Sequence, residues 1–417
     1  MSRTRPTSGK RKHGLQLSPR RVASAAALAV AAYFSLAATS GNVLRKASPE
    51  LAHTLAPNNG DITATLSAQQ FTARPSPEPD APAAQLARNA LFQDATAVEA
   101  LTVLGFQAQL RGNQAEADSI FSLGTRLSRR ELRPQLWAIE EAVSRGDIAG
   151  ALKHYDIALR TSADAQVMLY PILASALTEP KVRGLLLRIL QQEPNWTASF
   201  LSHASAHASS PSAVARFIGE AGAAKVPLPL DETARADLVA KLVEDEQYGE
   251  AWRYYTTFRP DAVRNRSRDP NFALASGTRA AFDWTTTDDA ALIASILQAE
   301  DGGALDFAAP PGRSGILATQ LQLLPAGSYR LQGRSAGIEQ PPRSRPFWVL
   351  NCVDGRELGK VMLPNSSQAG GVFSDIVTVP QNCPVQSLAL VAQSSSDIGG
   401  VSGQVTQVEL TPARQRS

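Results

Sequence analysis

A pattern of three residues recurs in the first half of the chain at an interval of 34 residues. It consists of a Gly, an Ala five residues later and an aromatic residue four further on, and it occurs as Gly112, Ala117 and Phe121 and again as Gly146, Ala151 and Tyr155. A third copy keeps the last two members, as Ala251 and Tyr255. A Gly ends one helix, a small Ala lets the two helices of a hairpin approach closely, and an aromatic ring fills the gap to the next helix. An interval of this length predicts a stack of helical hairpins.

The surrounding sequence agrees with this prediction. From about Leu86 to Arg259, apolar residues recur at i, i+3, i+4 and i+7 with short polar breaks, which predicts a run of amphipathic helices. The preceding segment, residues 45–85, ends in the stretch ARPSPEPDAPAAQ at 73–85. That stretch is a Pro-rich linker that cannot be helical throughout.

The array resembles the tetratricopeptide repeat, whose second helix carries the Gly, Ala and aromatic pattern. Leu104-Gly105 fits the Leu-Gly of that family's first helix, and LAPNN at 55–59 resembles the tail end of a degraded repeat. The match is weak between residues 165 and 230, where bulky Leu185 replaces the small residue and Pro180 stands in place of the Gly. The resemblance therefore covers residues 86–262 with diverged repeats.

The resemblance implies a curved helical solenoid that binds an envelope protein or peptide along its concave face. Carried onto this sequence, the first-helix positions that face the groove are Glu99, Phe106, Arg133 and Glu140. The alternative is that these four are ordinary solvated or packed helix residues. No enzyme chemistry follows from such an array.

The net charge of +3 is distributed unevenly along the chain. Residues 1–21 form a tail with seven basic residues and no acidic one, so everything after it sums to −4. Residues 22–44 carry no charge and are long enough to cross a bilayer as a helix, and Arg45 and Lys46 follow them. By the positive-inside rule, the tail stays in the cytoplasm. We therefore expect a single-pass protein of the bacterial inner membrane with a periplasmic bulk and no nucleic-acid partner.

Two alternatives to an anchor stay open for residues 22–44. The small-x-small site Ser35-Leu36-Ala37 suits a cleaved signal peptide, with the mature chain beginning near Ala38. A buried soluble helix is the other alternative. The anchor and the signal peptide both predict that the bulk of the chain is exported.

After Asp269-Pro270 the pattern changes to short alternating runs separated by Gly, Pro, Asn and Asp. Candidate strands lie near residues 304, 316, 328, 347, 375, 387 and 404. They predict an antiparallel β-sandwich over residues 275–417. The expected fold class is thus multi-domain, with one N-terminal transmembrane helix, an α-helical solenoid and a C-terminal sandwich. Phe282-Asp283-Trp284 followed by LLPAGSYRL resembles the galactose-binding-like jelly rolls of carbohydrate-binding modules.

A sugar-binding surface needs aromatic faces for the apolar side of a pyranose and nearby amides or carboxylates for its hydroxyls. The aromatic candidates in the sandwich are Trp284, Tyr329 and Trp348, with Asp283 and Asn351 as polar neighbours. The alternative is that the aromatic residues fill the core.

Cys352 and Cys383 are the two cysteines of the chain, and both fall in the sandwich. In an oxidising compartment they would close a loop of about 30 residues, which stabilises by roughly 3 to 4 kcal/mol in the chain-entropy model. Two buried free thiols are the alternative.

Patterns for other chemistry are incomplete. Residues 333–337 match G-x-S-x-G, but no His follows His207, so the hydrolase triad cannot be completed in its usual order. His203 and His207 are four residues apart without an accompanying Glu or a third ligand, so no metal site is expected. Neither a Gly-Lys-Ser/Thr phosphate loop nor a G-x-G-x-x-G after a strand is present, so no cofactor is expected.

These features favour a non-enzymatic, membrane-anchored envelope scaffold that holds a protein partner through its helices, in the assembly or export of surface polysaccharide. A second hypothesis makes the sandwich a carbohydrate-binding module, with a polysaccharide as its partner and the helices positioning it. An enzyme with an unfamiliar site is the third hypothesis, which the missing acid, base and metal constellations disfavour.

Overall fold

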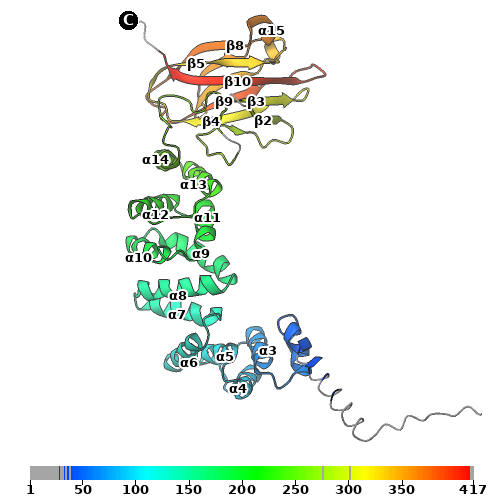
Figure 1. Cartoon of the computed structure of the whole chain (residues 1–417), viewed down its shortest axis with the longest axis vertical. Coiled ribbons are helices and arrows are strands. Elements are labelled where there is room, and N and C mark those ends of the chain that lie inside the picture. The colour runs from blue at the N-terminus through cyan, green and yellow to red at the C-terminus, as the bar shows by residue number, and fades with distance from the viewer. Residues whose placement is uncertain are drawn as a thin grey trace, which may run out of the picture. The chain divides into compact units, whose positions relative to one another are not determined.

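The computed structural model describes residues 28, 32, 35–36, 39–274, 277–299 and 302–413. The basic tail over 1–21 and most of the expected anchor over 22–44 lie outside them. No helix within these ranges is both long and apolar enough to cross a membrane. The chain divides into two compact units, Met1–Ala163 and Asp164–Ser417 (Figure 1).

Unit 1 is built from antiparallel helices joined by short turns. They are α2 (Pro49–Leu55), α3 (Gly60–Ala73), α4 (Pro82–Gln93), α5 (Val98–Leu110), α6 (Gln114–Leu127), α7 (Leu132–Ser144) and α8 (Ile148–Thr161). The side chains of Asn113 and Asp147 cap α6 and α8 by accepting hydrogen bonds from backbone N–H groups three residues on. The helices begin upstream of Leu86, in the segment 45–85 that is expected to hold a degraded repeat and a Pro-rich linker, because α3 packs on α4 and α5 through buried alanines.

The recurring pattern has the structural role that the sequence predicts. Gly112 and Gly146 adopt left-handed φ angles of 75° and 71° directly after α5 and α7. Ala117 and Phe121 are buried, at 0% and 1% exposure. A Cβ on Gly105 would meet the Phe121 ring at 2.8 Å, so the aromatic ring needs a glycine on the facing helix. These residues define helical hairpins in α5–α6 and α7–α8.

Unit 2 begins with a further set of helices. They are α9 (Asp164–Ala176), α10 (Pro180–Leu190), α11 (Thr197–His207), α12 (Pro211–Ala223), α13 (Glu232–Glu244) and α14 (Tyr248–Phe258). Pro180 fits at the first turn of α10, where a missing N–H costs nothing. Arg183, 4% exposed, forms an ion pair with Glu220 that ties α10 to α12. The helical repeat therefore continues through the stretch where the sequence pattern is weakest.

The rest of unit 2 consists of two packed antiparallel sheets, in the strand orders β1-β4-β9-β6-β7 and β2-β3-β10-β5-β8. The strands are β1 (Thr285–Thr286), β2 (Ile293–Ala299), β3 (Gly302–Ala309), β4 (Gly315–Gln322), β5 (Gly327–Ala336), β6 (Phe347–Cys352), β7 (Glu357–Met362), β8 (Val372–Val379), β9 (Gln386–Ala392) and β10 (Val401–Pro412). Short helical turns lie at Pro342–Ser344 and α15 (Ser366–Ala369). Every predicted strand is present, and β1, β2 and β7 are additional.

Alternation along each strand places one set of side chains between the sheets. From β6 the core receives Trp348, Leu350 and Cys352, and from β10 it receives Val401, Val405, Val408 and Leu410. The irregular register of β10 against β5, between Val405 and Gln407, keeps the apolar residues on the inner face across a bulge.

Candidate functional site

The structure places the predicted sugar-stacking residues in the core of the sandwich. Trp284 and Trp348 are 0% exposed with ring centroids 5.3 Å apart, and Tyr329 is 4% exposed. A ring with both faces packed against protein has no face left for a pyranose. The prediction of a stacking surface on these three residues is therefore wrong, and they fill the space between the sheets.

Asp283 is also buried, at 1% exposure, and its carboxylate is fully engaged. Its Oδ1 accepts a hydrogen bond from the Tyr255 hydroxyl at 2.6 Å and lies 3.3 Å from Arg268 Nε, while Oδ2 accepts from the backbone N–H of Ala280 at 3.1 Å. Burial, followed by the charge of Asp283, raises the pKa of Tyr255 far above its usual range, so the hydroxyl stays a donor. Asp283 therefore joins α14 to the sandwich and has no free oxygen for a ligand.

Asn351 does not join this group. It lies half-buried on the face of β6 opposite to the inward-pointing Trp348, so the five predicted residues form no common surface.

The four predicted groove residues separate into two kinds. Glu99 accepts a hydrogen bond from the Thr65 hydroxyl at 2.7 Å, and Phe106 packs between Phe71 and Phe121. Arg133 and Glu140 are exposed on α7. Binding of a partner by these residues stays a prediction.

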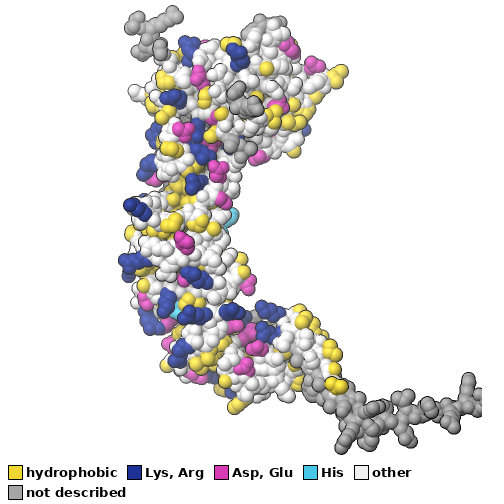
Figure 2. All heavy atoms as spheres, viewed as in Figure 1, with side chains coloured by type: hydrophobic (Ala, Val, Ile, Leu, Met, Phe, Trp, Pro, Cys, Tyr) yellow, Lys and Arg dark blue, Asp and Glu magenta, His cyan; other side chains and the backbone are white. Residues whose placement is uncertain are grey.

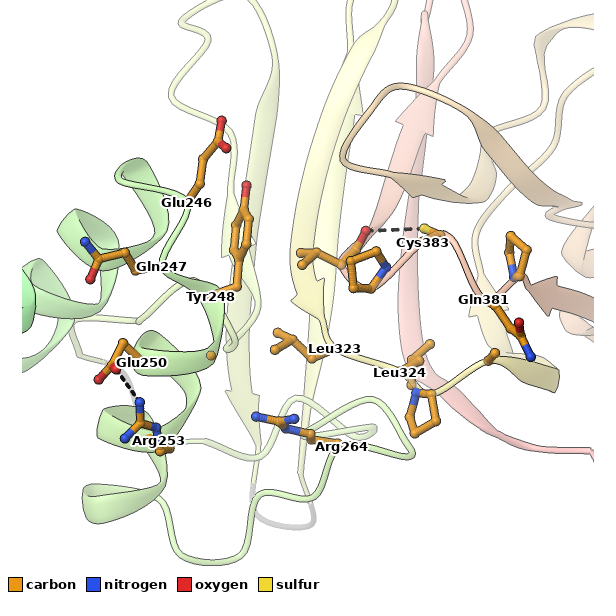
Figure 3. A pocket seen from close by; sticks show the side chains of 16 residues that line it. Glu246, Gln247, Tyr248, Glu250, Arg253, Arg264, Leu323, Leu324, Gln381 and Cys383 are labelled. Atoms are coloured by element: carbon orange, nitrogen blue, oxygen red, sulfur yellow. Dashed lines mark hydrogen bonds and ion pairs between the residues drawn. The ribbon is translucent and has the colours of Figure 1, made fainter.

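The sandwich and the last helices of unit 2 together enclose an open cleft of about 920 Å³. One wall comes from the α13–α14 turn and α14, with Glu246, Tyr248, Glu250 and Arg253. The opposite walls are the loops 323–326 and 380–385 of the sandwich, and Arg264 lies in the connection between the parts. Figure 3 shows Glu246 and Tyr248 on the helical side and Leu323, Leu324 and Gln381 on the sandwich side.

Buried hydrogen bonds hold the loop 323–326 in place. The Leu324 N–H donates to Gln386 Oε1 at 2.9 Å, and Gln386 is completely buried. The hydroxyl of Tyr329 donates to the Pro325 carbonyl at 2.8 Å. Tyr329, predicted to touch a sugar, instead fixes the backbone of the cleft wall.

The disulfide between Cys352 and Cys383 holds the loop 380–385. It ties that loop to the end of β6 and closes a sequence separation of 31 residues. In the chain-entropy model such a loop stabilises by roughly 3 to 4 kcal/mol. Both sandwich walls of the cleft are thus anchored in the core.

Glu246 on the helical wall has an unusual backbone. It lies five residues before Ala251 and nine before Tyr255, so it occupies the position that Gly112 and Gly146 hold in the other copies of the pattern. Its φ is 58°, in the left-handed region that favours glycine. Glu193 and Lys225, after α10 and α12, are also left-handed without being glycine. At Glu246 this geometry sets an exposed carboxylate at the edge of the cleft.

The remaining polar groups of the cleft differ in how far they are already satisfied. Glu250 and Arg253 form an ion pair with each other. Arg264 lies with its guanidinium 5.8 Å from the centroid of Trp252 and pairs with no carboxylate in the described part of the chain. The Tyr248 ring is half-buried and Gln381 is exposed. An aromatic ring, an amide, a carboxylate and a guanidinium therefore line one open space.

The sequence alone does not reveal this cleft, because its residues come from four separate stretches of the chain, 246–253, Arg264, 323–326 and 380–385. One signal was present in the sequence, namely the replacement of the repeat's Gly by Glu246.

The other patterns singled out in the sequence form no site. Ser335 is buried within β5 and its hydroxyl donates to the Gly371 carbonyl at 3.3 Å, away from any strand-to-helix turn. His203 and His207 lie on α11 with ring centroids 5.1 Å apart. Within the described residues, no group of three His, Cys, Asp or Glu side chains is arranged to hold a metal.

Comparisons with known proteins give likenesses of fold only. No protein-family model matches the chain, and no curated protein matches it either. Among solved structures, the chain is similar to the module TmCBM61 in complex with β-1,4-galactotriose, with 16% identity over 36% of this chain and 100% of that one and a TM-score of 0.25. It is similar to CsCBM6-3 from Clostridium stercorarium in complex with cellobiose, with 16% identity over 33% and 100% and a TM-score of 0.21.

A third similar structure is the enzymatically active domain of tailspike protein 4 from bacteriophage CBA120, with 12% identity and a TM-score of 0.22. The match covers 31% of this chain but spans only 18% of the tailspike chain. At these identities and TM-scores, none of the likenesses carries an inference about function.

Proposed function

We propose that unit 2 binds a glycan in the cleft between α14 and the loops 323–326 and 380–385. The observation that carries the proposal is the set of groups that line this cleft, since the half-buried Tyr248 ring offers an apolar face and polar side chains of the same lining offer hydrogen bonds. Glu246 and Gln381 can bond sugar hydroxyls, and Arg264 adds a charged donor. A volume of about 920 Å³ has room for more than one sugar ring.

The rigidity of the cleft supports the same proposal. Each wall is held by a buried contact: the Tyr255–Asp283 hydrogen bond on the helical side, the Gln386 and Tyr329 bonds on one loop, and the Cys352–Cys383 disulfide on the other. A preformed cleft loses little conformational entropy on binding, so weak contacts to hydroxyls suffice for useful affinity.

The test is binding of the full chain to a panel of immobilised oligosaccharides, repeated with Tyr248→Ala. Loss of the ring is expected to weaken binding of the best-bound glycan about 5-fold, since stacking on an aromatic face contributes about 1 kcal/mol. Phe92→Ala is the matched control, because Phe92 is 90% exposed in unit 1 and its removal is expected to change nothing. Undiminished binding by Tyr248→Ala contradicts the proposal, as does a full panel with no bound glycan.

We further propose, from the sequence, that the chain is non-enzymatic and is anchored in the bacterial inner membrane through residues 22–44 with its bulk in the periplasm. The helices are then a tetratricopeptide-like stem that holds an envelope protein, in assembly or export of surface polysaccharide. The exposed Glu140 on α7 is the groove residue available to such a partner. A pull-down from envelope extract with Glu140→Lys as comparison tests this part separately from the cleft, and equal capture by both forms contradicts it.

A further inference from the structure

Four arginines gather where α6 ends and α7 begins in unit 1. Residues 126–133 read RLSRRELR, and the side chains of Arg126, Arg129, Arg130 and Arg133 are all exposed. None of the four forms an ion pair with a carboxylate in the part of the chain that the structure describes. Other arginines of the same unit are neutralised, as the pairs Arg111–Glu116, Arg145–Glu141 and Arg160–Asp156. We call residues 126–133 the basic loop.

Two further cations lie near the basic loop although they are about 85 residues upstream in the sequence. Partial burial and the charge of Glu99 raise the pKa of Glu131, and the positive charges of Arg45, Arg133 and Lys46 oppose that rise. Arg45 and Lys46 therefore lie within electrostatic range of Glu131, which belongs to the loop, and Arg45 also forms an ion pair with Asp61 at 3.3 Å. They directly follow the uncharged run 22–44.

Apolar side chains lie exposed beside these charges. Leu123 and Leu127 in the last turn of α6 are 38% and 42% exposed, on either side of Arg126. On the face shown in Figure 2, Lys and Arg side chains are numerous over the helices. Exposed leucines among unpaired arginines are the combination that lies at a lipid headgroup boundary, where the cations attract anionic headgroups and the apolar groups enter the acyl edge.

We propose that the basic loop, together with Arg45 and Lys46, binds the surface of a bilayer that contains anionic lipids. Arg45 and Lys46 directly follow residues 22–44, so insertion of that run into a bilayer would bring them to its surface, and the electrostatic attraction acts without insertion too. The proposal is independent of the glycan cleft, which lies entirely in unit 2.

Other anionic partners fit these residues less well. Single-stranded nucleic acid requires aromatic side chains on which bases stack, and residues 126–133 contain none. A soluble acidic polysaccharide satisfies the arginines but gains nothing from Leu123 and Leu127, because it offers no apolar phase.

The test measures, on the full chain, how fast each arginine reacts with an arginine-specific dicarbonyl reagent, read by mass spectrometry. The reaction is compared in vesicles of phosphatidylcholine and in vesicles with about 30% phosphatidylglycerol. We expect Arg126, Arg129, Arg130 and Arg133 to be protected only by the anionic vesicles, and less so at high salt. Arg188 and Arg216, exposed in unit 2, serve as internal controls and are expected to react equally in both.

The substitution arm uses Arg129→Gln with Arg130→Gln. Each basic residue near the surface contributes about 1 kcal/mol, so protection of the two remaining arginines is expected to need about 30-fold more anionic lipid. The control carries Arg188→Gln with Arg216→Gln, which removes the same charge elsewhere. Equal reactivity in both vesicles overturns the proposal. Soluble polygalacturonate is tested at the same concentration of negative charge as the vesicles. If it protects the arginines equally well, the lipid proposal is overturned in favour of an acidic polymer.

Discussion

Replacing Glu246 by glycine is expected to stabilise unit 2 while weakening glycan binding. Glu246 has a φ of 58°, and a non-glycine residue there costs roughly 1 to 2 kcal/mol through the clash of its Cβ with the backbone. Glycine removes that clash, but it also gives the unfolded chain more conformational freedom, which offsets part of the gain in stability. Since the Glu246 side chain is exposed, no buried contact is lost. The net expectation is a gain of roughly 0.5 to 1 kcal/mol in the free energy of unfolding.

The assay is urea unfolding of the full chain followed by tryptophan fluorescence, because Trp252 lies on α14, the helix that begins two residues after Glu246. Lys225→Gly is the matched control, since Lys225 has a φ of 56° after α12 and lies outside the cleft. Both variants should be stabilised, and only Glu246→Gly should bind glycan more weakly. Equal stability of wild type and Glu246→Gly would refute the argument from backbone strain. Equal binding by the two variants would refute the role of the Glu246 carboxylate.

Two further substitutions test the contacts that support the fold. Tyr255→Phe removes the donor to the buried Asp283 carboxylate and is expected to destabilise unit 2 by about 1.5 to 3 kcal/mol, measured by the same urea assay; a change below about 0.5 kcal/mol contradicts a strong bond at this joint. Gly105→Ala is expected to destabilise unit 1 by about 1 to 3 kcal/mol, because its Cβ would meet the Phe121 ring, whereas Gly184→Ala, with open space around it in α10, should stabilise by up to about 1 kcal/mol. Thermal unfolding, followed by circular dichroism, compares the Tm of the two glycine variants. A rise in Tm for both would contradict the close packing of α5 on α6.

The helical part of the fold could be predicted because its signal is local. Gly112 and Ala117 act within one hairpin, so a short window of sequence contains both the turn and the close helix contact. The helices after residue 165 are harder to predict, because the repeat pattern is weak there. The ion pair between Arg183 and Glu220 ties these helices together, and its two residues are far apart in the sequence.

Strands were predicted where alternation is strong and missed where it is not. β7, with the sequence ELGKVM, has charged residues at its first and fourth positions and a Gly at its third. β1 has only two residues, so neither strand shows a clear period of two. Alternation also leaves open which face of a strand is buried. On β6, Trp348 and Asn351 point to opposite faces, and only the pairing of the two sheets decides that Trp348 faces the core.

The candidate site could not be predicted as a site, since it arises from tertiary packing. More than 50 residues separate Tyr248 from Leu324, and again Leu324 from Gln381. None of the three belongs to a recognisable motif. The aromatic residues that the sequence suggests as sugar-binding lie in or beside predicted strands. In a β-sandwich, an aromatic residue at such a position usually packs into the core. The exception is Glu246, whose place in the repeat marks it from the sequence alone.

Hydrogen–deuterium exchange of the full chain, with and without its best-bound glycan, tests the central claim most directly. We expect that added glycan slows exchange in residues 246–250, 323–326 and 380–385, three of the segments that line the cleft. Protection confined to another surface, such as the outer face of the sheet that contains β10, β5 and β8, would contradict the account.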